Sequence, residues 1–485
     1  MYRTRFSSAL AMAALAAILL PTLVIAQITF QRTYGGAERD EAWSVRQTTD
    51  GGYIIAGSTS SFGVPSEYAY LVKTDAHGDT IWTRNYDFAT RSAAYAVRQT
   101  SDGGYIIAGS ALGPGMWDAC LIKTDSHGDT MWTQTYGGLD DEYGYSVVQT
   151  NDGGFVLTGR TLSFGAGQED VYLVRTKDDG DTMWTRTYGS TGFDEGASVQ
   201  QTSDSGFIVT GSVESLGAGG ADVCLLKTDA RGDTVWARAI GGASGDWGSA
   251  VRRTYDGGYI LVGTTYSFGA GGADVYAVKA DVNGNILWTR AFGGAGTDFG
   301  YSVEQTTDSG YIIAAWTESF GSGYADVWLV RTDVSGDTLW TRTFGGDSFD
   351  YGHCVLQTED GGYAVAGNAW PSGAHAYDVY FIKTDADGHV AVAEPKVSPT
   401  RSTALSLSCE PNPCRGATRV SFTPLASSSK PSTLRMYDSQ GRVVLARQVT
   451  TSSFPLATSD LPAGAYFVRC DVSGEHATAR LVLQH

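Results

Sequence analysis

The sequence is short of positive charge. It has 34 lysines and arginines against 52 aspartates and glutamates, so its formal net charge is −18 over 485 residues. A surface of this sign repels nucleic acid and anionic lipid, and we expect neither as a partner. Apolar residues do not recur every three or four positions, which excludes helical repeats. A disordered low-complexity chain is also excluded, because 42% of the residues are hydrophobic and 12% are aromatic.

The motifs of common catalytic and metal sites are missing as well. The chain contains no G-x-S-x-G, no H-E-x-x-H and no C-x-x-C, and its seven histidines are scattered. The D-x-[DN]-x-[DN]-G pattern of calcium loops is also absent. We therefore expect no catalysis, no cofactor and no metal.

Long apolar runs occur only at the N-terminus. Arg3 and Arg5 precede an apolar stretch that ends in Val24-Ile25-Ala26, with small or short residues where signal peptidase requires them. We interpret residues 1–26 as a signal peptide cleaved after Ala26. A retained membrane anchor is the alternative, but the run is short and Pro21 interrupts it. The mature chain should therefore be exported and lack a transmembrane segment.

Glycine is abundant, at 62 residues, and much of it lies in a repeated turn. The string D-[GS]-G-[YF] occurs seven times, at a spacing of 50 or 52 residues. A fixed period near fifty residues indicates a propeller, a solenoid or an array. The turns begin at Asp50, Asp102, Asp152, Asp204, Asp256, Asp308 and Asp360.

Each repeat predicts four short strands. In the first they are 42–48, 53–59, 69–75 and 80–86, separated by Asp/Gly turns and one Gly/Ser-rich loop. Four strands per unit make one propeller blade. The fold class predicted is therefore all-β, with a seven-bladed β-propeller over residues 27–392. A small residue followed by valine, as in Ser44-Val45, suits the crowded innermost strand.

The fourth strand of six repeats carries a tryptophan, which we expect to pack between blades. The equivalent residue of the seventh is Phe30, near the N-terminus, because the copy after the last repeat has decayed to Val392. We therefore predict that residues 28–34 pair with residues 379–383 and close the ring. The tryptophans are Trp82, Trp132, Trp184, Trp236, Trp288 and Trp340.

The repeat resembles known propeller families. Its order of strands and turns is similar to WD-repeat blades, and the string T-R-T-Y-G-G…D-G-G-Y-I-I-A-G resembles the bacterial SBBP-type repeat. Residues 71–82 are similar to the tryptophan-docking segment of quinoprotein propellers. Together the resemblance covers residues 28–392, and it implies a fold rather than an activity.

A second domain follows a Pro/Ser/Thr-rich linker at residues 393–405. Residues 406–485 predict a small β-sandwich and resemble the type A C-terminal sorting domain of type IX secretion cargo. That resemblance implies a Sec route through the periplasm, outer-membrane secretion machinery as partner, and a location at or beyond the surface of a Gram-negative-type bacterium. An Ig-like module of the flagellar-hook-cap type is the alternative. The matching residues are Asn412, Pro413, Gly441, Arg442, Leu461, Pro462, Gly464 and Tyr466.

The six cysteines fall into two groups. We expect Cys120, Cys224 and Cys354 to be buried free thiols in the propeller. The other three lie in the small domain, where export permits a disulfide. Two pairings are open, Cys409–Cys414 and Cys409–Cys470.

Acidic residues recur in register with the repeat. One ring opens the glycine turns, a second opens the third strands, and a third precedes the inner strands, for example Asp50, Asp118 and Asp40. We favour a loop-stabilising role, because catalytic acids would break the symmetry of the repeat. Calcium binding is the alternative.

Four tryptophans outside the repeated position predict a ligand site: Trp43, Trp247, Trp316 and Trp370. They lie near the loops before the inner strands and between the second and third strands, which differ most between repeats. Exposed aromatic rings there would suit a glycan or a peptide. We therefore favour a non-catalytic binding protein. A secreted propeller enzyme acting on polysaccharide, as a glycoside hydrolase or lyase, and a structural surface-layer component are the alternatives.

Overall fold

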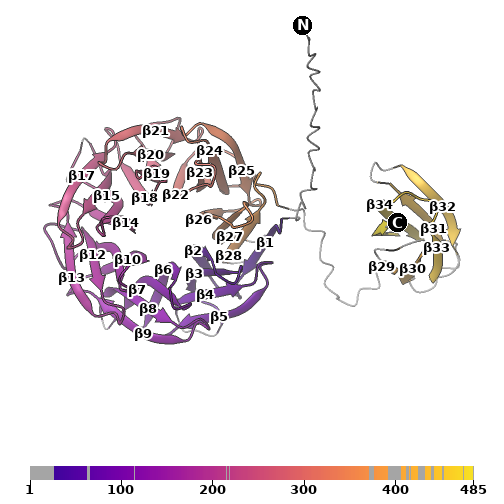
Figure 1. Cartoon of the computed structure of the whole chain (residues 1–485), viewed down its shortest axis with the longest axis horizontal. Coiled ribbons are helices and arrows are strands. Elements are labelled where there is room, and N and C mark those ends of the chain that lie inside the picture. The colour runs from indigo at the N-terminus through magenta and orange to yellow at the C-terminus, as the bar shows by residue number, and fades with distance from the viewer. Residues whose placement is uncertain are drawn as a thin grey trace, which may run out of the picture. The chain divides into compact units, whose positions relative to one another are not determined.

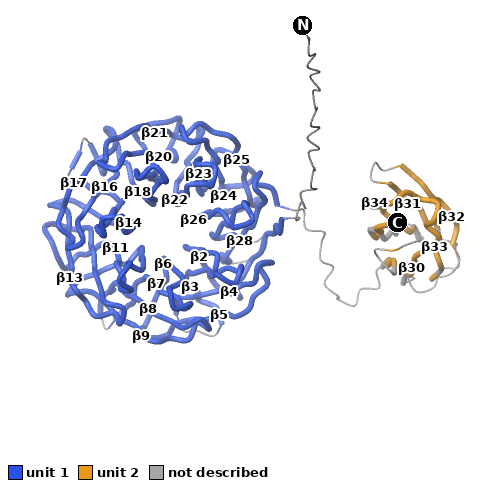
Figure 2. Tube along the Cα trace, in the orientation of Figure 1, with its two compact units in different colours: residues 1–392 blue, residues 393–485 orange. Residues whose placement is uncertain are grey.

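The computed structural model describes residues 27–62, 66–113, 115–214, 216–217, 219–370 and 376–390 of the first part of the chain. In the C-terminal part it describes residues 406–410, 414, 417–423, 432–438, 442–449, 453–472 and 475–483. The chain divides into two compact units, 1–392 and 393–485 (Figure 2). The predicted signal peptide and linker lie outside the described residues. Across these ranges every element is a strand, and no helix could cross a membrane.

The first unit contains seven four-stranded antiparallel sheets within the ranges above. Sheet 1 consists of β2 (Asp40–Gln47), β3 (Tyr53–Thr59), β4 (Tyr68–Thr74) and β5 (Thr80–Tyr86). Sheet 2 consists of β6 (Arg91–Gln99), β7 (Tyr105–Leu112), β8 (Trp117–Thr124) and β9 (Thr130–Tyr136). Sheet 3 consists of β10 (Glu142–Gln149), β11 (Phe155–Thr161), β12 (Asp170–Thr176) and β13 (Thr182–Tyr188). Sheet 4 consists of β14 (Asp194–Gln201), β15 (Phe207–Val213), β16 (Asp222–Thr228) and β17 (Thr234–Ile240).

The remaining three sheets continue the same order. Sheet 5 consists of β18 (Asp246–Arg253), β19 (Tyr259–Thr265), β20 (Asp274–Ala280) and β21 (Ile286–Phe292). Sheet 6 consists of β22 (Asp298–Gln305), β23 (Tyr311–Thr317), β24 (Asp326–Thr332) and β25 (Thr338–Phe344). Sheet 7 consists of β26 (Asp350–Gln357), β27 (Tyr363–Ala369), β28 (Asp378–Thr384) and β1 (Phe30–Tyr34).

The sheets form a closed ring around a central opening, with the first strand of each sheet innermost (Figure 1). Each sheet packs against the next, and sheet 7 packs against sheet 1. The inner strands match the predicted repeats but begin about two residues earlier. In sheet 1 the strand starts at Asp40, which pairs with Thr59 of β3. The Asp40 amide also donates a hydrogen bond to the carbonyl of Tyr377, just before β28, at 2.8 Å.

Burial follows the position of each strand in its sheet. Every residue of β3 and β4 is buried, because neighbouring sheets cover both faces of these middle strands. The outer strand β5 is exposed or half-buried along most of its length, and only its last residue, Tyr86, is buried. Ser44 and Val45 are buried on the innermost strand, and the Ser44 hydroxyl accepts a hydrogen bond from the Val97 amide of the next sheet at 3.3 Å. The prediction for this residue pair is therefore confirmed.

The N-terminal strand closes the ring as predicted. β1 pairs antiparallel with β28, and Phe30 faces Lys383 while Tyr34 faces Val379. The Tyr34 hydroxyl donates a hydrogen bond to the carbonyl of Gly78 in sheet 1, at 2.7 Å. Sheet 7 therefore takes its outer strand from the opposite end of the chain. Val392 lies outside the described residues.

The repeated tryptophans pack between sheets, which confirms their predicted role. Each contacts the first aromatic residue of the second strand in the next sheet, with ring centroids 5.7–6.2 Å apart. Phe30 fills the equivalent place and lies 5.2 Å from Phe381 and against Gly78. The contact pairs are Trp82–Tyr105, Trp132–Phe155, Trp184–Phe207, Trp236–Tyr259, Trp288–Tyr311 and Trp340–Tyr363.

Within its described residues the second unit contains two antiparallel sheets that share one apolar core. The core includes Val420, Leu434, Leu456 and Val468, which come from both sheets. One sheet consists of β29 (Ser406–Glu410), β30 (Ala417–Thr423) and β33 (Ser453–Ala457). The other consists of β32 (Val443–Val449), β31 (Ser432–Tyr437), β34 (Gly464–Val472) and β35 (Glu475–Leu483).

Candidate functional site

Each innermost strand contains one extra residue. In β2, Ala42 faces Gly57 and Ser44 faces Ala56, so Trp43 has no partner on β3. The same β-bulge occurs in all seven inner strands. A bulge bends the strand and redirects the side chain of its extra residue. The bulge residues are Trp43, Tyr95, Tyr145, Ala197, Ser249, Tyr301 and His353.

A glycine on the second strand accommodates this bulge. A Cβ atom at Gly57 would lie 1.7 Å from the carbonyl oxygen of Glu41, far inside contact distance. Glycine, without a Cβ atom, permits this approach in six sheets, whereas in sheet 6 Ala315 faces Gly300 beside the same bulge. The glycine of the repeated I-I-A-G string therefore helps to direct the bulge residues. Equivalent close approaches occur at Gly109, Gly159, Gly211, Gly263 and Gly367.

Five of the seven bulge residues form a chain of ring contacts. Neighbouring ring centroids lie 4.4–6.1 Å apart. The chain is interrupted at sheets 4 and 5, where the bulge residues are Ala197 and Ser249. In order, the linked rings are Tyr145, Tyr95, Trp43, His353 and Tyr301.

His353 is the most enclosed member of this chain, at 8% exposed. Its Nδ1 atom lies 2.9 Å from the carbonyl oxygen of Ala42, which can only accept, so Nδ1 carries the proton. Burial lowers the pKa of His353 to about 4. The ring is therefore neutral near pH 7 and stacks as a flat aromatic surface against Trp43.

A second group of rings lies at the start of the inner strands, beside the variable loops. Trp316 on β23 stacks on Phe299 of β22, with centroids 4.9 Å apart and planes 11° apart. Its Nε1 donates to the Tyr301 hydroxyl at 3.4 Å, and its edge meets Tyr351 at 5.4 Å. Tyr351 also stacks near His353, at 6.3 Å, which joins this group to the bulge residues.

Contacts extend this group across sheets 5, 6 and 7. On one side Phe299 lies 6.4 Å from Tyr266, which lies 5.6 Å from Trp247. On the other side Tyr351 lies 5.8 Å from Tyr377, which lies 4.8 Å from Trp370. We call this set, with the bulge rings, the aromatic arc. Its members at the loop end are Trp247, Tyr266, Phe299, Trp316, Tyr351, Tyr377 and Trp370.

All four predicted site tryptophans belong to the aromatic arc. Trp247 is the most exposed, at 37%, while Trp43, Trp316 and Trp370 are half-buried. Sequence reasoning missed the tyrosines, phenylalanine and histidine that connect them. For those on the inner strands the register contains the signal, because they occupy the position just before the small-residue–valine pair or two residues earlier. Tyr266 and Tyr377 lie in the loops after β19 and before β28 and have no such register.

Two carboxyl groups lie at this end of the inner strands and were also missed. Glu41 is 5% exposed and is held by Arg39 at 2.5 Å, and burial raises its pKa. Burial also raises the pKa of Glu195, and the positive charge of nearby Arg160 offsets only part of this rise. Both residues differ from those at the same position of the other repeats, and this difference could have identified them in the sequence. The other five sheets carry, at this position, Ala93, Tyr143, Trp247, Phe299 and Tyr351.

The recurrent aspartates stabilise loops, as predicted. Asp50 accepts a hydrogen bond from the Gly52 amide at 3.0 Å and forms an ion pair with the buried Lys73 at 2.9 Å. Asp40 is fully buried and accepts from the Ser61 hydroxyl at 2.8 Å. Where the chain is described, no cluster of three or more His, Cys, Asp or Glu side chains is arranged to hold a metal ion.

All six cysteines are buried, and Cys120, Cys224, Cys354, Cys409 and Cys414 are free thiols. Neither disulfide considered from the sequence is therefore present. Burial raises the pKa of the Cys409 thiol to about 11, and the neighbouring Cys414 contributes to this rise. The Cys414 sulfur lies 3.8 Å from the Thr458 hydroxyl, which provides a polar neighbour in place of a second sulfur.

Of the described residues of the predicted sorting motif, Arg442, Leu461 and Pro462 lie between strands, and Gly464 and Tyr466 lie on β34. Arg442 forms an ion pair with Asp438 at 2.8 Å, and the Tyr466 hydroxyl donates to the Pro462 carbonyl at 2.9 Å. Leu461 packs partly against the core, and Gly464 begins β34. Three further motif residues fall outside the described residues: Asn412, Pro413 and Gly441.

Residues 410–484 match the family described as the secretion system C-terminal sorting domain. This domain marks the chain for export through the type IX secretion system, to the cell surface or the medium. No curated protein matches the chain.

Solved structures similar to this chain share little sequence with it. PorZ, a surface component of the type IX secretion system of Porphyromonas gingivalis, is 11% identical with a TM-score of 0.43, and the match covers 93% of this chain and 60% of PorZ. A puromycin hydrolase is 10% identical with a TM-score of 0.46, covering 91% and 60%. Sqt1 from Chaetomium thermophilum is 11% identical with a TM-score of 0.42, covering 70% and 82%. The chain thus spans about three fifths of the length of the first two.

Proposed function

We propose that the chain is an exported, non-catalytic binding protein that combines a seven-bladed β-propeller, closed by β1, with a small β-sandwich for sorting. A signal peptide at residues 1–26 would take it across the inner membrane of a Gram-negative-type bacterium. The sorting domain then directs the chain through the outer membrane. The propeller is the part that meets a ligand outside the cell.

The aromatic arc is the observation that supports binding. It joins four tryptophans from sheets 1, 5, 6 and 7 into one connected set of rings beside the loops that differ most between repeats. Contacts between rings restrict the side chains, so little rotamer entropy is lost when a ligand stacks on them. Flat rings with a polar edge suit the apolar face of a sugar or a peptide side chain.

A glycan and peptide array with the full-length exported protein tests the proposal. Once a bound ligand is found, its affinity should fall about tenfold or more in W247A and in W316A, since a buried aromatic contact contributes about 1–3 kcal/mol. The matched control is Y255A. Tyr255 is 70% exposed and follows β18 at its other end, whereas Trp247 lies at the start of that strand.

Two outcomes contradict the proposal. One is loss of binding in Y255A with unchanged binding in both tryptophan variants. The other is an array on which no glycan or peptide is retained above the level seen with a variant lacking both Trp247 and Trp316.

A polysaccharide-cleaving enzyme is the second candidate, because Glu41 and Glu195 have raised pKa values beside the aromatic arc. Glycosidases and lyases use carboxyl groups of this kind. Product release from a polysaccharide panel that disappears in both E41Q and E195Q would favour this function. Cleavage that persists in both variants, or no cleavage by the wild type, would count against it.

A further inference from the structure

Each inner strand ends, next to the glycine turn, in two residues. The last is nearly the same in all sheets, and the one before it differs from sheet to sheet. The last residue is glutamine in six of seven sheets and Arg253 in sheet 5. The residue before it varies widely. In the order of the sheets it is Arg46, Arg98, Val148, Gln200, Arg252, Glu304 and Leu356.

The glutamine position has a structural role that explains its repetition. The Gln99 Oε1 atom accepts a hydrogen bond from the Thr49 amide in the turn of the preceding sheet, at 2.9 Å. The glutamines of five other sheets make the same contact. Arg253 replaces the glutamine at the boundary of sheets 4 and 5, where it donates to the Gln201 carbonyl at 3.3 Å.

The variable position makes no such repeated contact, so its residues are free to specialise. Three of them are arginines, and each donates a hydrogen bond to the carbonyl of the valine that precedes it, at 2.7–2.9 Å. Arg46 also donates to the Cys354 sulfur, at 3.3 Å. The bond to the valine carbonyl fixes the direction of the side chain. A guanidinium has five N–H donors, so capacity remains for a ligand.

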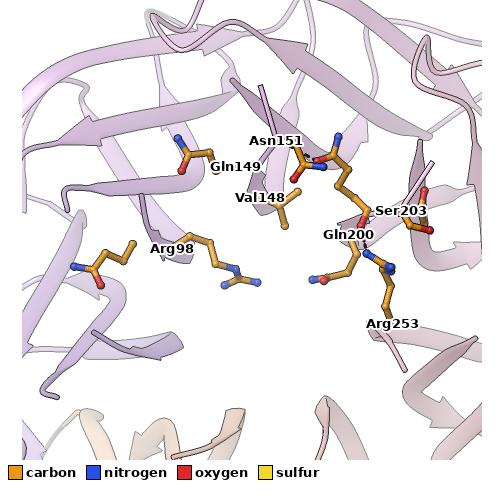
Figure 3. A pocket seen from close by; sticks show the side chains of 10 residues that line it. Arg98, Val148, Gln149, Asn151, Gln200, Ser203 and Arg253 are labelled. Carbon is orange, nitrogen blue, oxygen red and sulfur yellow. Dashed lines mark hydrogen bonds between the residues drawn. The ribbon is translucent and has the colours of Figure 1, made fainter. Parts of the chain in front are cut away.

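The arginines line a cavity at the ends of the inner strands nearest the glycine turns. A space of about 360 Å³ is bounded by Arg46, Arg98, Arg252 and Glu304 together with glutamines and a leucine. A second space of about 370 Å³ adjoins it through Arg98 and Gln200 and includes Arg253. Figure 3 shows Arg98 and Arg253 extending into this opening from different sheets.

The charge of this cavity is opposite to that of the whole protein. Its lining contains four arginines and one carboxylate, Glu304, whereas the chain carries a net charge of −18. Burial lowers the pKa of Arg98, and the charges of Arg46 and Arg252 lower it further, while Cys354 and Glu304 offset part of this fall. The guanidiniums therefore repel one another within the fold, and an anion placed between them would relieve that repulsion.

We propose that this cavity binds a small oxyanion group, a carboxylate, sulfate or phosphate, between Arg46, Arg98 and Arg252. Planar guanidiniums pair with the oxygens of such groups through two parallel hydrogen bonds. Gln200, which occupies the variable position in sheet 4, would add a neutral donor beside them. This site lies at the opposite end of the inner strands from the loop end of the aromatic arc, so the two can be tested separately.

The test measures binding of sodium sulfate, sodium phosphate and sodium citrate to the full-length protein by calorimetry, at constant ionic strength set with sodium chloride. Citrate tests the carboxylate, and the other two test tetrahedral anions. The variant is R98Q/R252Q, because glutamine already occupies this position in sheet 4, as Gln200. The control is R84Q/R290Q, which removes the same charge from two partly exposed outer-strand arginines.

We expect saturable binding of at least one anion, a loss of about 100-fold or more in R98Q/R252Q, and little change in R84Q/R290Q, since each charge-assisted pair is worth roughly tenfold. Without the anion, R98Q/R252Q should unfold at the same temperature as wild type or higher, because repulsion has been removed. Three results would overturn the proposal. They are the absence of saturable binding of any anion, equal binding by both variants, and a lower unfolding temperature of R98Q/R252Q than of wild type. W247A should bind the anion normally, whatever its effect on the ligand of the aromatic arc.

Discussion

The indole ring of Trp43 stacks on the imidazole ring of His353, with centroids 4.4 Å apart and planes 14° apart. Trp43 lies on the innermost strand of sheet 1 and His353 on that of sheet 7. The stack therefore exists only when the first and last sheets meet. Closure of the ring and assembly of the aromatic arc are the same event.

Phe30 should be essential for this closure. It is 8% exposed and packs on Phe381 and Gly78 at the junction of sheets 7 and 1. F30A should lower the free energy of unfolding by about 3 kcal/mol, through lost burial and a residual cavity. Denaturant unfolding measures this, with V235A as control, since Val235 is 57% exposed on an outer strand. Equal effects in both variants would mean that β1 does not close the ring.

His353 should make stability depend on pH. Its pKa is about 4 in the folded protein and near 6.5 when unfolded. Between these values the unfolded chain binds a proton that the folded chain does not, so stability falls as the pH decreases from 6.5 to 4. H353F keeps a ring against Trp43 and should flatten the unfolding temperature over this range. H127Q, at an exposed turn, is the control, and an identical pH profile for H353F and wild type would contradict the assignment.

Two serines occupy turn positions that favour glycine. Ser205 and Ser309 have φ values of 64° and 70°, where the other glycine turns carry Gly51, Gly103 and their equivalents. A left-handed conformation is costly for a residue with a Cβ atom. S205G and S309G should each raise the free energy of unfolding by about 1 kcal/mol. The reverse change, G257S, should lower the free energy of unfolding by a similar amount. If G257S raises it instead, the turn position does not favour glycine.

The second unit should be required for export but not for folding of the first. The two units have separate cores and separate sheets. A chain truncated after Pro395 should accumulate in the periplasm with an unchanged far-UV spectrum and cooperative unfolding. Cell fractionation and proteinase access to intact cells measure its location. Truncated protein at the cell surface would show that residues 396–485 are not the sorting determinant.

Much of the ring could be predicted from the sequence because its constraints are local and occur seven times. The Asp-Gly-Gly turns, the small-residue–valine pair and the outer-strand tryptophan are each required by contacts within one sheet or between neighbouring sheets. The same repetition located Phe30 as the seventh outer-strand aromatic. Repetition also identified the four tryptophans, since they are the residues that depart from it.

Only the tertiary structure decided how those exceptions combine. The bulge that redirects Trp43 depends on the close approach of Gly57, and the stack on His353 depends on a ring closed between residues 310 positions apart, 353 minus 43. The arginine cavity likewise forms from the ends of strands in different sheets, each unremarkable in its own repeat. Charges and rings interact through space, so their neighbours are set by the arrangement of the seven sheets and cannot be read from spacing along the chain.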